Sequence, residues 1–392
     1  MTKPYMFEKP LGLRDTLPQA HRISYELKDL FYKEMNQWGY DFIKTPALEF
    51  AETVGKASAI DDHQLFKFID RQGIPVVLRP DMTTPIARVV GSELKEAVLP
   101  LRLAYTSALY RAQKSEGGHP SEFEQVGAEL IGDATPEADA EIISLMVKLF
   151  EIVGLDPIRI VIGHVGFVDA FIRDLVFDEE DVHTLRELLY MKNDVGFREL
   201  VAQLDIPQQN KTDLNQFIDT RSLDIDKTLQ FMEHHPCSDY YQEVNNFMHL
   251  LKAYGLLEKI DLDLTLVPHL DYYTGFVFEG YGGKIGFSLA SGGRYNDLLK
   301  QFNRPAPATG FGIRLDRLIE SLPMEAFPDE PEKVAVVYEL DTIQEALEYA
   351  NQKRKEGIRV VLQNAKSIQN ERAFQEQFKT VKSFIKTGGL SI

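Results

Sequence analysis

The sequence predicts an α+β protein in which an antiparallel sheet is flanked by helices and a small α/β module follows. Three observations support this prediction. Residues 101–111 and 121–132 read as two strands joined by a polar loop, which is the pattern of an antiparallel pair. Residues 18–39 place apolar side chains three and four positions apart, as an amphipathic helix does. Residues 333–392 alternate strand-like and helical segments, which is typical of a separate α/β unit.

The first predicted helix is clearly bounded at both ends, since it starts at Pro18 and is closed by Gly39. Its apolar positions are Ile23, Leu27, Leu30, Phe31, Met35 and Trp38. In residues 41–50 a strand-like stretch is interrupted by Pro46, which has no backbone N–H to donate. We therefore expect an edge strand or a bulge at this point.

A second helix is predicted to follow Thr135 and Pro136, a good cap and first-turn pair, and to end at Gly154. Its inward positions are Ile142, Leu145, Leu149 and Ile152. Residues 158–163 are short and strongly apolar, which favours a strand. Residues 177–259 are polar, rich in Asp, Asn and Gln, and helical in pattern, so we interpret them as a helical insertion into a β-rich domain.

Strands are expected again at 264–281 and 284–295, paired across a hairpin turn at Gly282 and Gly283. Residues 308–322 then look like a glycine-containing strand that runs directly into a helix. The order of strands and helices therefore predicts one β-rich core that extends over most of the chain.

Composition suggests where this core ends. The stretch 323–333 is rich in proline and acidic residues and reads as a linker. We expect a core over residues 1–325, including the insertion at 177–259, and a small α/β module at 333–392. The module has ten basic and seven acidic residues, so contact with RNA stays open, but a packing or docking role is preferred.

Length and charge exclude several classes of protein. A chain of 392 residues is too long for one ordinary core, so two or three domains are expected. Its net charge of −17 disfavours broad binding to nucleic acid. The single cysteine, Cys237, excludes an intrachain disulfide and any cysteine-rich metal site. No apolar run has the length of a membrane span and the N-terminus has no apolar signal core, so we expect a cytoplasmic protein without membrane segments.

One strand carries an arrangement that suits a ligand site. In residues 121–132 the side chains alternate, so Gln125, Gly127 and Glu129 share one face. A glycine between two polar groups leaves room for a ligand against the backbone. An antiparallel sheet with one solvated face would give the same alternation, and on this strand alone that interpretation is favoured.

Other candidate motifs are weak when each is taken alone. Taken alone, the tyrosines of DYYTG (271–275) are better explained by core packing, and LRPDMT (78–83) suggests only a rigid rim around its proline. The glycine-rich stretches lack the spacing of a P-loop or a dinucleotide fingerprint, so we predict no cofactor. We also predict no metal site, because adjacent histidines point apart and Pro236 interrupts the group. That group is His234, His235, Cys237 and His249.

Taken in order, the motifs are specific. The chain contains GLRDTLP, a helix that ends at WGY, LRPDMT, YR at 110–111, EFEQVGAELIG, LDYYTG, ASGGRYNDL and GFGIRLDRL. This series resembles the core of class II aminoacyl-tRNA synthetases of the histidyl-tRNA synthetase type, over roughly residues 5–325. The resemblance implies a six- or seven-stranded antiparallel sheet flanked by helices. It also implies a homodimer formed through the first helix and the strand at Pro46.

The chain departs from those synthetases where they hold ATP. Pro268 stands in place of an arginine that assists activation of the amino acid. Gln113 replaces a glutamate of the second motif, and Arg314 replaces a glycine that lets adenine approach the strand. Arg111 and Arg317 still stand where two ATP-clamping arginines belong. Because positioned cations stabilise the charge that develops on the phosphates, the losses predict a degenerate ATP site and no catalytic residues.

The resemblance implies that the part of the site that binds the amino acid is retained. Asp81, Thr83 and Gln125 would hold the α-ammonium, and Arg111 would face the carboxylate. Asp81 stands where the synthetases have glutamate, so its side chain is one methylene shorter.

The implied imidazole end of the site has four further residues. Glu129 and Tyr273 would take the two ring nitrogens, and Tyr272 and Tyr295 would lie close by. Imidazole needs both a donor and an acceptor from its partners, which a carboxylate and a phenol can supply together.

A chain that binds histidine without activating it resembles the family of ATP phosphoribosyltransferase regulatory subunits. That resemblance implies a short-form catalytic subunit as partner, a homodimer within a hetero-oligomer, and feedback inhibition by histidine in the first step of histidine biosynthesis. No tRNA partner is expected. An active but divergent histidyl-tRNA synthetase is the alternative, and a ligase or sensor for a different amino acid is a weaker third.

Overall fold

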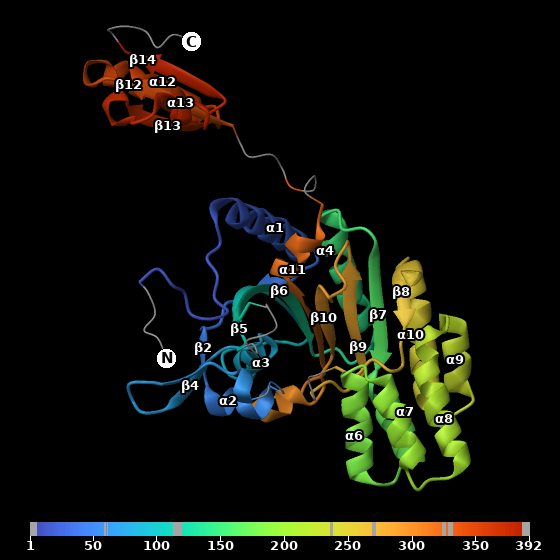
Figure 1. The fold of residues 1–392 in the computed structure, drawn as a ribbon. Helices are drawn as coiled ribbons and strands as arrows, with labels where there is room; N and C mark the ends of the chain where they lie inside the picture. The colour runs from blue at the N-terminus through green and yellow to red at the C-terminus, as the bar shows by residue number, and fades with distance from the viewer. Residues whose placement is uncertain are drawn as a thin grey trace. The chain divides into compact units, whose positions relative to one another are not determined.

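The computed structural model describes residues 6–58, 60, 62–112, 120–235, 238–268, 272–323, 327 and 332–385. The chain divides into two compact units, residues 1–326 and 327–392, each with its own sheet and helices (Figure 1). Among the described residues, no helix combines the length and apolarity that a membrane crossing requires.

The first unit is built on an eight-stranded sheet in the order β1-β5-β6-β11-β10-β9-β7-β8. Its strands are β1 (Asp41–Phe42), β5 (Leu101–Tyr110), β6 (Glu122–Ile131), β7 (Ile158–His164), β8 (Ile260–Leu262), β9 (Phe276–Gly282), β10 (Ala290–Arg294) and β11 (Ala308–Arg314). The predicted pair at 101–111 and 121–132 is confirmed, with Leu101 opposite Ile131.

The sheet is mixed, which corrects the purely antiparallel sheet of six or seven strands that we expected. The six central strands are antiparallel, but β1 runs parallel to β5 and β8 runs parallel to β7. These two edge strands have two and three residues. Strands so short show no readable alternation in a sequence, so pattern analysis misses them.

Near Pro46 the chain passes from one sheet to another. β1 is an edge strand of the large sheet, as expected there. After Pro46, β2 (Leu48–Phe50) joins a second, three-stranded sheet with β4 (Pro75–Leu78) and β3 (Lys67–Ile69). The proline therefore marks a crossing between sheets rather than a bulge within one strand.

Helices cover both faces of the large sheet (Figure 1). The predicted helices α1 (Pro18–Gln37) and α4 (Pro136–Ile152) are confirmed, and they contact each other. α4 and α11 (Leu315–Ser321) pack against β6 and β11. On the opposite face, α3 (Thr83–Gly91) contributes to a core cluster that also contains Tyr105, Phe123 and Tyr295. The remaining helix of this part, α2 (Ala51–Ala57), contacts β4.

The helical insertion is confirmed over its described residues. After α5 (Val165–Leu175) come α6 (Glu179–Tyr190), α7 (Asp194–Gln203), α8 (Gln208–Asp219), α9 (Ile225–Glu233) and α10 (Ser238–Ala253). In Figure 1 these helices stand together beside the edge of the sheet formed by β7 and β8. Asp178 caps α6 and Asp224 caps α9 through side-chain oxygens, as their sequence positions favour.

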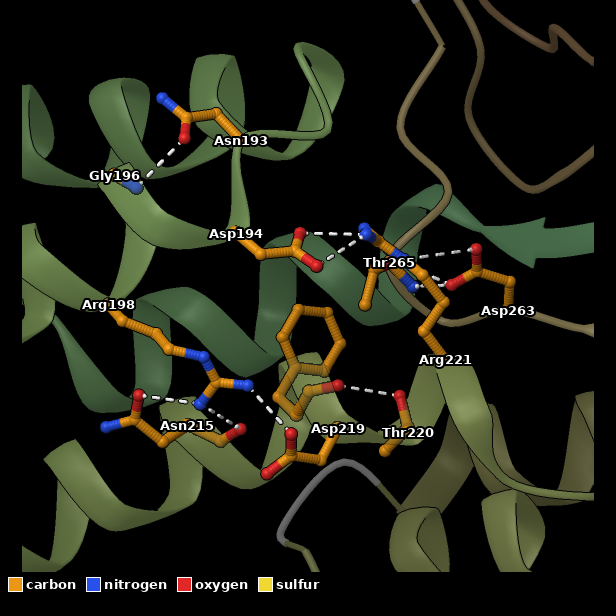
Figure 2. A network of polar contacts seen from close by, with 11 residues as sticks. Asn193, Asp194, Gly196, Arg198, Asn215, Asp219, Thr220, Arg221, Asp263 and Thr265 are labelled. Atoms are coloured by element: carbon orange, nitrogen blue, oxygen red, sulfur yellow. Dashed lines mark hydrogen bonds and ion pairs between the residues drawn. The ribbon is translucent and has the colours of Figure 1, made fainter.

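Arg221 connects the insertion to the sheet (Figure 2). Its guanidinium pairs with Asp194 at 2.7 Å and donates to the Thr265 hydroxyl at 2.7 Å. Asp263 lies 3.7 Å from the same side chain. Since 263–265 directly follow β8, these contacts fix the start of the segment that leads to β9.

Two strand predictions in the second half were wrong. Residues 264–275 are not a strand where they are described, because the Asp263 carboxylate accepts bonds from the Thr265 N–H and hydroxyl and turns the chain. The predicted two-residue hairpin at Gly282 and Gly283 is a longer connection. β10 begins at Ala290, opposite Gly280, so residues 283–289 lie outside the ladder.

The predicted strand-to-helix unit at 308–322 is confirmed as β11 and α11. The second unit has the predicted α/β alternation. It contains β12 (Lys333–Tyr338), α12 (Ile343–Lys355), β13 (Arg359–Asn364), α13 (Glu371–Gln375) and β14 (Thr380–Phe384). The strands are parallel in the order β13-β12-β14, around a small core of Val334, Val336, Ala346 and Ala350.

Candidate ligand-binding site

The candidate site is built on two neighbouring strands, β6 and β11. Glu129 lies opposite Gly310, and Gln125 opposite Arg314 in the same register. A Cβ at Gly310 would overlap the Glu129 carboxylate, and one at Gly312 would overlap the Gln125 amide. The two glycines of GFG therefore leave room for the two polar side chains of β6, which lie across β11 instead of projecting outward.

Glu129 is the buried acid at the centre of this site. Its carboxylate accepts hydrogen bonds from the Tyr295 hydroxyl at 2.5 Å and from the Thr83 hydroxyl at 2.9 Å. Burial raises the pKa of Glu129 to about 7, and the nearby charge of Asp81 raises it too. The two hydrogen bonds act in the opposite direction but do not offset the effect of burial. The carboxyl group therefore titrates near neutral pH.

This titration predicts a pH-dependent stability. Because the folded-state pKa of Glu129 exceeds its ordinary value of 4.5, the folded chain holds the proton more tightly than the unfolded chain does. The resulting stability is present below about pH 4.5 and is lost as the pH rises through 7. Between pH 5 and pH 8, wild type should lose up to about 3 kcal/mol relative to Glu129→Gln, which stays neutral. Urea unfolding at both pH values measures this, and an equal change in the two proteins would contradict it.

The solvated-face interpretation of β6 was wrong. Glu129 is 2% exposed, and both faces of the strand are buried from Val126 onward. Gln125 is held by the Tyr105 hydroxyl, which donates to its side-chain oxygen at 2.8 Å. The alternation reflects a polar, enclosed face rather than contact with water.

Gly127 does not leave room for a ligand against the backbone, as the sequence had suggested. A Cβ there would overlap the Phe311 carbonyl oxygen and the Tyr105 ring, so the space is filled by the protein itself. The glycine is needed for packing between β6, β5 and β11 and does not hold open a place for a ligand.

The eight residues that the resemblance implied for histidine binding line one small cavity of about 40 Å³. They are Asp81, Thr83, Arg111, Gln125, Glu129, Tyr272, Tyr273 and Tyr295. Asp81 Oδ1 accepts the Thr84 N–H at 2.9 Å in the first turn of α3, so part of this carboxylate is already engaged. The rings of Tyr272 and Tyr273 have centroids 4.7 Å apart and are only half-buried, which corrects the pure core-packing interpretation of this motif.

A larger cavity of about 430 Å³ adjoins the first. Arg111, Gln125 and Tyr273 line both, so the two are continuous at these residues. Three of the four residues assigned to a degenerate ATP site, Pro268, Arg314 and Arg317, line the larger cavity. The fourth, Gln113, lies outside the described residues.

Arg314 occupies the aromatic surface of the larger cavity. Its guanidinium carbon lies 3.9 Å from the centroid of Phe123. Asp316 fixes this position, with a 2.7 Å contact to Nη2. A guanidinium over an aromatic face is a favourable cation–π arrangement, and it covers that face against other planar groups. The arginine that stands in place of the family's glycine therefore lies on the Phe123 ring.

Sequence analysis missed residues that come from distant segments. Tyr190 and Lys192, at the end of α6, and Glu279 of β9 line the larger cavity. Nothing near Lys192 in the sequence marks it, because the helical pattern predicts only where α6 ends. Tyr105, on the neighbouring strand β5, could have been found from the pairing of 101–111 with 121–132, which places it opposite Gly127.

No group of three or more potential metal ligands occurs among the described residues. Of the four residues weighed for a metal, Cys237 lies outside them. His235 packs against the rings of Phe171 and Phe231, and burial lowers the pKa of its imidazole.

Comparison with known families matches both units. A family model described as Histidyl-tRNA synthetase matches residues 12–318, and one described as Histidyl-tRNA synthetase HisZ, C-terminal domain, matches residues 335–386. A histidyl-tRNA synthetase structure from Nostoc sp. has the same fold, with a TM-score of 0.77 at 22% identity, covering 95% of this chain and 89% of that one. The fold is therefore that of a class II aminoacyl-tRNA synthetase of the histidyl type.

Closer relatives define the family. Two proteins named ATP phosphoribosyltransferase regulatory subunit match almost end to end. The one from Halalkalibacterium halodurans is 46% identical over 99% of this chain and 98% of its own length, and the one from Bacillus subtilis is 43% identical over 97% of each. A crystal structure titled ATP phosphoribosyltransferase regulatory subunit/histidyl-tRNA synthetase, from Bacillus halodurans, has a TM-score of 0.90 at 44% identity, over 98% of this chain and all of that one. The chain belongs to the family of ATP phosphoribosyltransferase regulatory subunits.

Proposed function

We propose that this chain is the cytoplasmic regulatory subunit of a short-form ATP phosphoribosyltransferase, with histidine as its effector and no catalytic activity of its own. Its family membership supports the role in the first step of histidine biosynthesis. The observation that carries the choice of ligand is the polarity of the smaller cavity. Glu129 with two hydroxyl partners lies inside it, and Arg111 lies where it joins the larger cavity.

Histidine fits this polarity in one orientation. The imidazole would lie toward Glu129, Tyr272 and Tyr273, where a carboxylate and phenols can match both ring nitrogens. The carboxylate would lie toward Arg111, whose Nε donates to the Pro80 carbonyl at 2.8 Å. Among the described residues, the terminal nitrogens of this guanidinium have no hydrogen-bond partner, so they are suited to a bidentate contact.

The α-ammonium would lie between Asp81, Thr83 and Gln125. Each of these has an oxygen in or beside the cavity, although Thr83 already donates to Glu129. A volume of about 40 Å³ holds little more than water, so histidine binding requires lining side chains to move. The half-buried rings of Tyr272 and Tyr273 can turn at the least cost in packing.

The regulatory role makes a prediction about assembly. Co-expression with a short-form catalytic subunit should give a stable hetero-oligomer that contains a homodimer of this chain, and its phosphoribosyltransferase activity should fall when histidine is added. Inhibition requires that histidine bind one state of the complex more tightly, typically by about 1–3 kcal/mol of coupling free energy. Size-exclusion chromatography and activity assays with and without histidine measure both. Failure of the two chains to associate at micromolar concentration would refute the proposal.

Loss of adenylation is a second expected outcome. Arg314 covers the Phe123 ring and Pro268 has no side-chain donor, so neither purine stacking nor the family's activating cation is provided. Histidine-dependent exchange of labelled pyrophosphate into ATP should stay at background, and a native histidyl-tRNA synthetase is the positive control. Arg111 and Arg317 in the larger cavity favour the alternative, a divergent synthetase, and exchange above background would establish it.

A further inference from the structure

Arg221, which lies in the short turn after α8, joins the insertion to the sheet. Its Nη1 contacts both oxygens of the Asp194 carboxylate, at 2.7 and 2.9 Å. Its Nε and Nη2 donate to the Thr265 hydroxyl at 2.9 and 2.7 Å (Figure 2). The Asp263 carboxylate lies 3.7 Å from Nε. One cation therefore connects an acid of the insertion to the turn that follows β8.

The insertion end of this contact has a fixed position. Asp194 is the first residue of α7, and the Asn193 side chain caps that helix by accepting a backbone N–H of the first turn at 2.9 Å. Arg221 follows Thr220, a buried residue whose hydroxyl donates to the Phe217 carbonyl at 2.7 Å. Helix ends therefore hold both the guanidinium and the carboxylate with which it pairs.

The sheet end of the contact is a turn over residues 263–266. The Asp263 N–H donates to the Ile162 carbonyl of β7 at 2.8 Å, and the Leu266 N–H donates to the Asp263 carbonyl at 3.2 Å. A Cβ at Gly163 would lie 2.8 Å from the Leu266 Cβ, so this glycine lets the turn lie directly on β7. The turn belongs to no strand ladder, so its position depends on these contacts and on Arg221.

Leu266 connects this turn to the smaller cavity. It directly follows Thr265 and is buried in a core cluster with Val165 and Val277, against which Tyr273 packs. Tyr273 also lines the smaller cavity. A shift of the turn would therefore move the surface on which the Tyr273 ring rests, although the described lining of both cavities does not include Arg221.

The turn is sensitive to loss of this guanidinium because Thr265 is buried. The Thr265 hydroxyl donates to the Asp263 carboxylate at 2.6 Å and accepts from Arg221. Without the guanidinium this hydroxyl would lose its donors, and the Asp194 and Asp263 carboxylates would lose the cation beside them. A buried acceptor without a donor is costly, so the turn would rearrange to find one.

We propose that Arg221 is a positioning residue of the histidine site, which holds residues 263–266 on β7 and thereby fixes where Tyr273 contacts the ligand. The proposal rests on histidine being the ligand of the smaller cavity. The Tyr273 ring is only half-buried, so its position depends on the few neighbours against which it packs. The insertion therefore contributes to histidine affinity through a side chain that does not touch histidine.

The test compares two arginine variants of the insertion by calorimetric titration of the purified full chain with histidine. Arg221→Met should weaken histidine binding by about tenfold, within the range of residues that act through a packed neighbour. The matched control is Arg198→Met. The Arg198 side chain is 40% exposed against 30% for Arg221, and its described partners, Asn215 and Asp219, both lie in α8 (Figure 2). Its loss should lower the stability in urea by a similar amount and leave histidine affinity unchanged.

A second variant tests the contact from the side of the sheet. Thr265→Val removes the accepting hydroxyl with little change in volume and leaves Arg221 paired with Asp194. It should weaken histidine binding by about threefold, and the double variant Arg221→Met/Thr265→Val should bind no more weakly than Arg221→Met alone, because both changes remove one contact. Wild-type affinity in both single variants would overturn the positioning role, and so would equal losses in Arg221→Met and Arg198→Met.

Hydrogen exchange distinguishes failure of this proposal from failure of the proposed function. Exchange is followed by mass spectrometry in the free chain, for the peptide that contains Thr265 and Leu266. This peptide should exchange about tenfold faster in Arg221→Met than in Arg198→Met, because only the first variant releases the turn. Wild type that does not bind histidine would refute the proposed function. Equal exchange in the two variants would overturn the positioning role, whatever the ligand.

Discussion

Glu129→Ala is expected to lower the affinity for histidine by about a hundredfold and to abolish feedback inhibition of the complex. Glu129 is a buried acid in the cavity lining, and its carboxylate accepts hydrogen bonds from the Thr83 and Tyr295 hydroxyls. Removal of the carboxylate takes away a charged hydrogen-bond acceptor and leaves two buried hydroxyls without it. Together these changes amount to roughly 3 kcal/mol of binding free energy. Calorimetric titration with histidine, and inhibition assays on the assembled complex, measure the two effects.

Matched variants show whether this effect is local. Glu122→Ala removes an exposed carboxylate from the same strand, whose only described contact is with Tyr110, and should leave histidine binding unchanged. Tyr273→Phe removes one hydroxyl from the lining and should weaken histidine binding by about tenfold. All three variants should still assemble with the catalytic subunit. Unchanged inhibition in both Glu129→Ala and Tyr273→Phe would place the effector site elsewhere.

Gly127→Ala is expected to destabilise the first unit by about 3 kcal/mol or more. The added methyl group would overlap the Phe311 carbonyl oxygen and the Tyr105 ring, in the middle of the sheet. The Phe311 backbone belongs to β11, which pairs with β6 on both sides of this point, so it cannot move without breaking ladder bonds. Overpacking of a rigid site typically costs 1–3 kcal/mol, and contact with backbone lies at the upper end.

Gly55→Ala is the control for this prediction. Gly55 lies in α2, is exposed, and has no atom within 4 Å of an added Cβ. The same chemical change there should be neutral or raise stability by up to about 1 kcal/mol, because alanine favours the helix. Urea unfolding of wild type and both variants gives the comparison. Equal stability of Gly127→Ala and Gly55→Ala would show that the strands relax more readily than their packing indicates.

Much of the fold could be predicted because it depends on neighbours along the chain. The periodicity of 18–37, the proline and glycine that bound 136–152, and the alternation of 122–131 are properties of local sequence, and each gave the correct element. The predicted cap Thr135 makes no side-chain capping bond, because its hydroxyl donates to Asp133. The ordered motifs also predicted which side chains share a site, since all eight implied histidine-binding residues line one cavity.

Local sequence patterns gave the wrong structure where strand length or strand register determined it. β1 and β8 are too short to show a pattern. The connection after β9 is longer than a two-residue hairpin because the β9–β10 ladder starts at Ala290. The Asp263 carboxylate holds the start of residues 264–275, which we had predicted as a strand, in a turn. The short strands and the longer connection depend on pairing with other strands, whereas Asp263 acts through a local turn that strand periodicity does not reveal.

The sequence by itself determined the kinds of groups available: a carboxylate beside tyrosines, and arginines where a nucleotide would otherwise lie. Only the tertiary structure decided what each group does. The strand register placed Gly310 opposite Glu129 and Gly312 beside the Gln125 amide, and it brought the Phe311 carbonyl and the Tyr105 ring against Gly127. It also set Arg314 on Phe123. Lys192, which follows the end of α6, lines the larger cavity beside Arg314. The physical reason is that side-chain surroundings depend on which strands and helices meet in space, and sequence spacing carries no direct record of those distances.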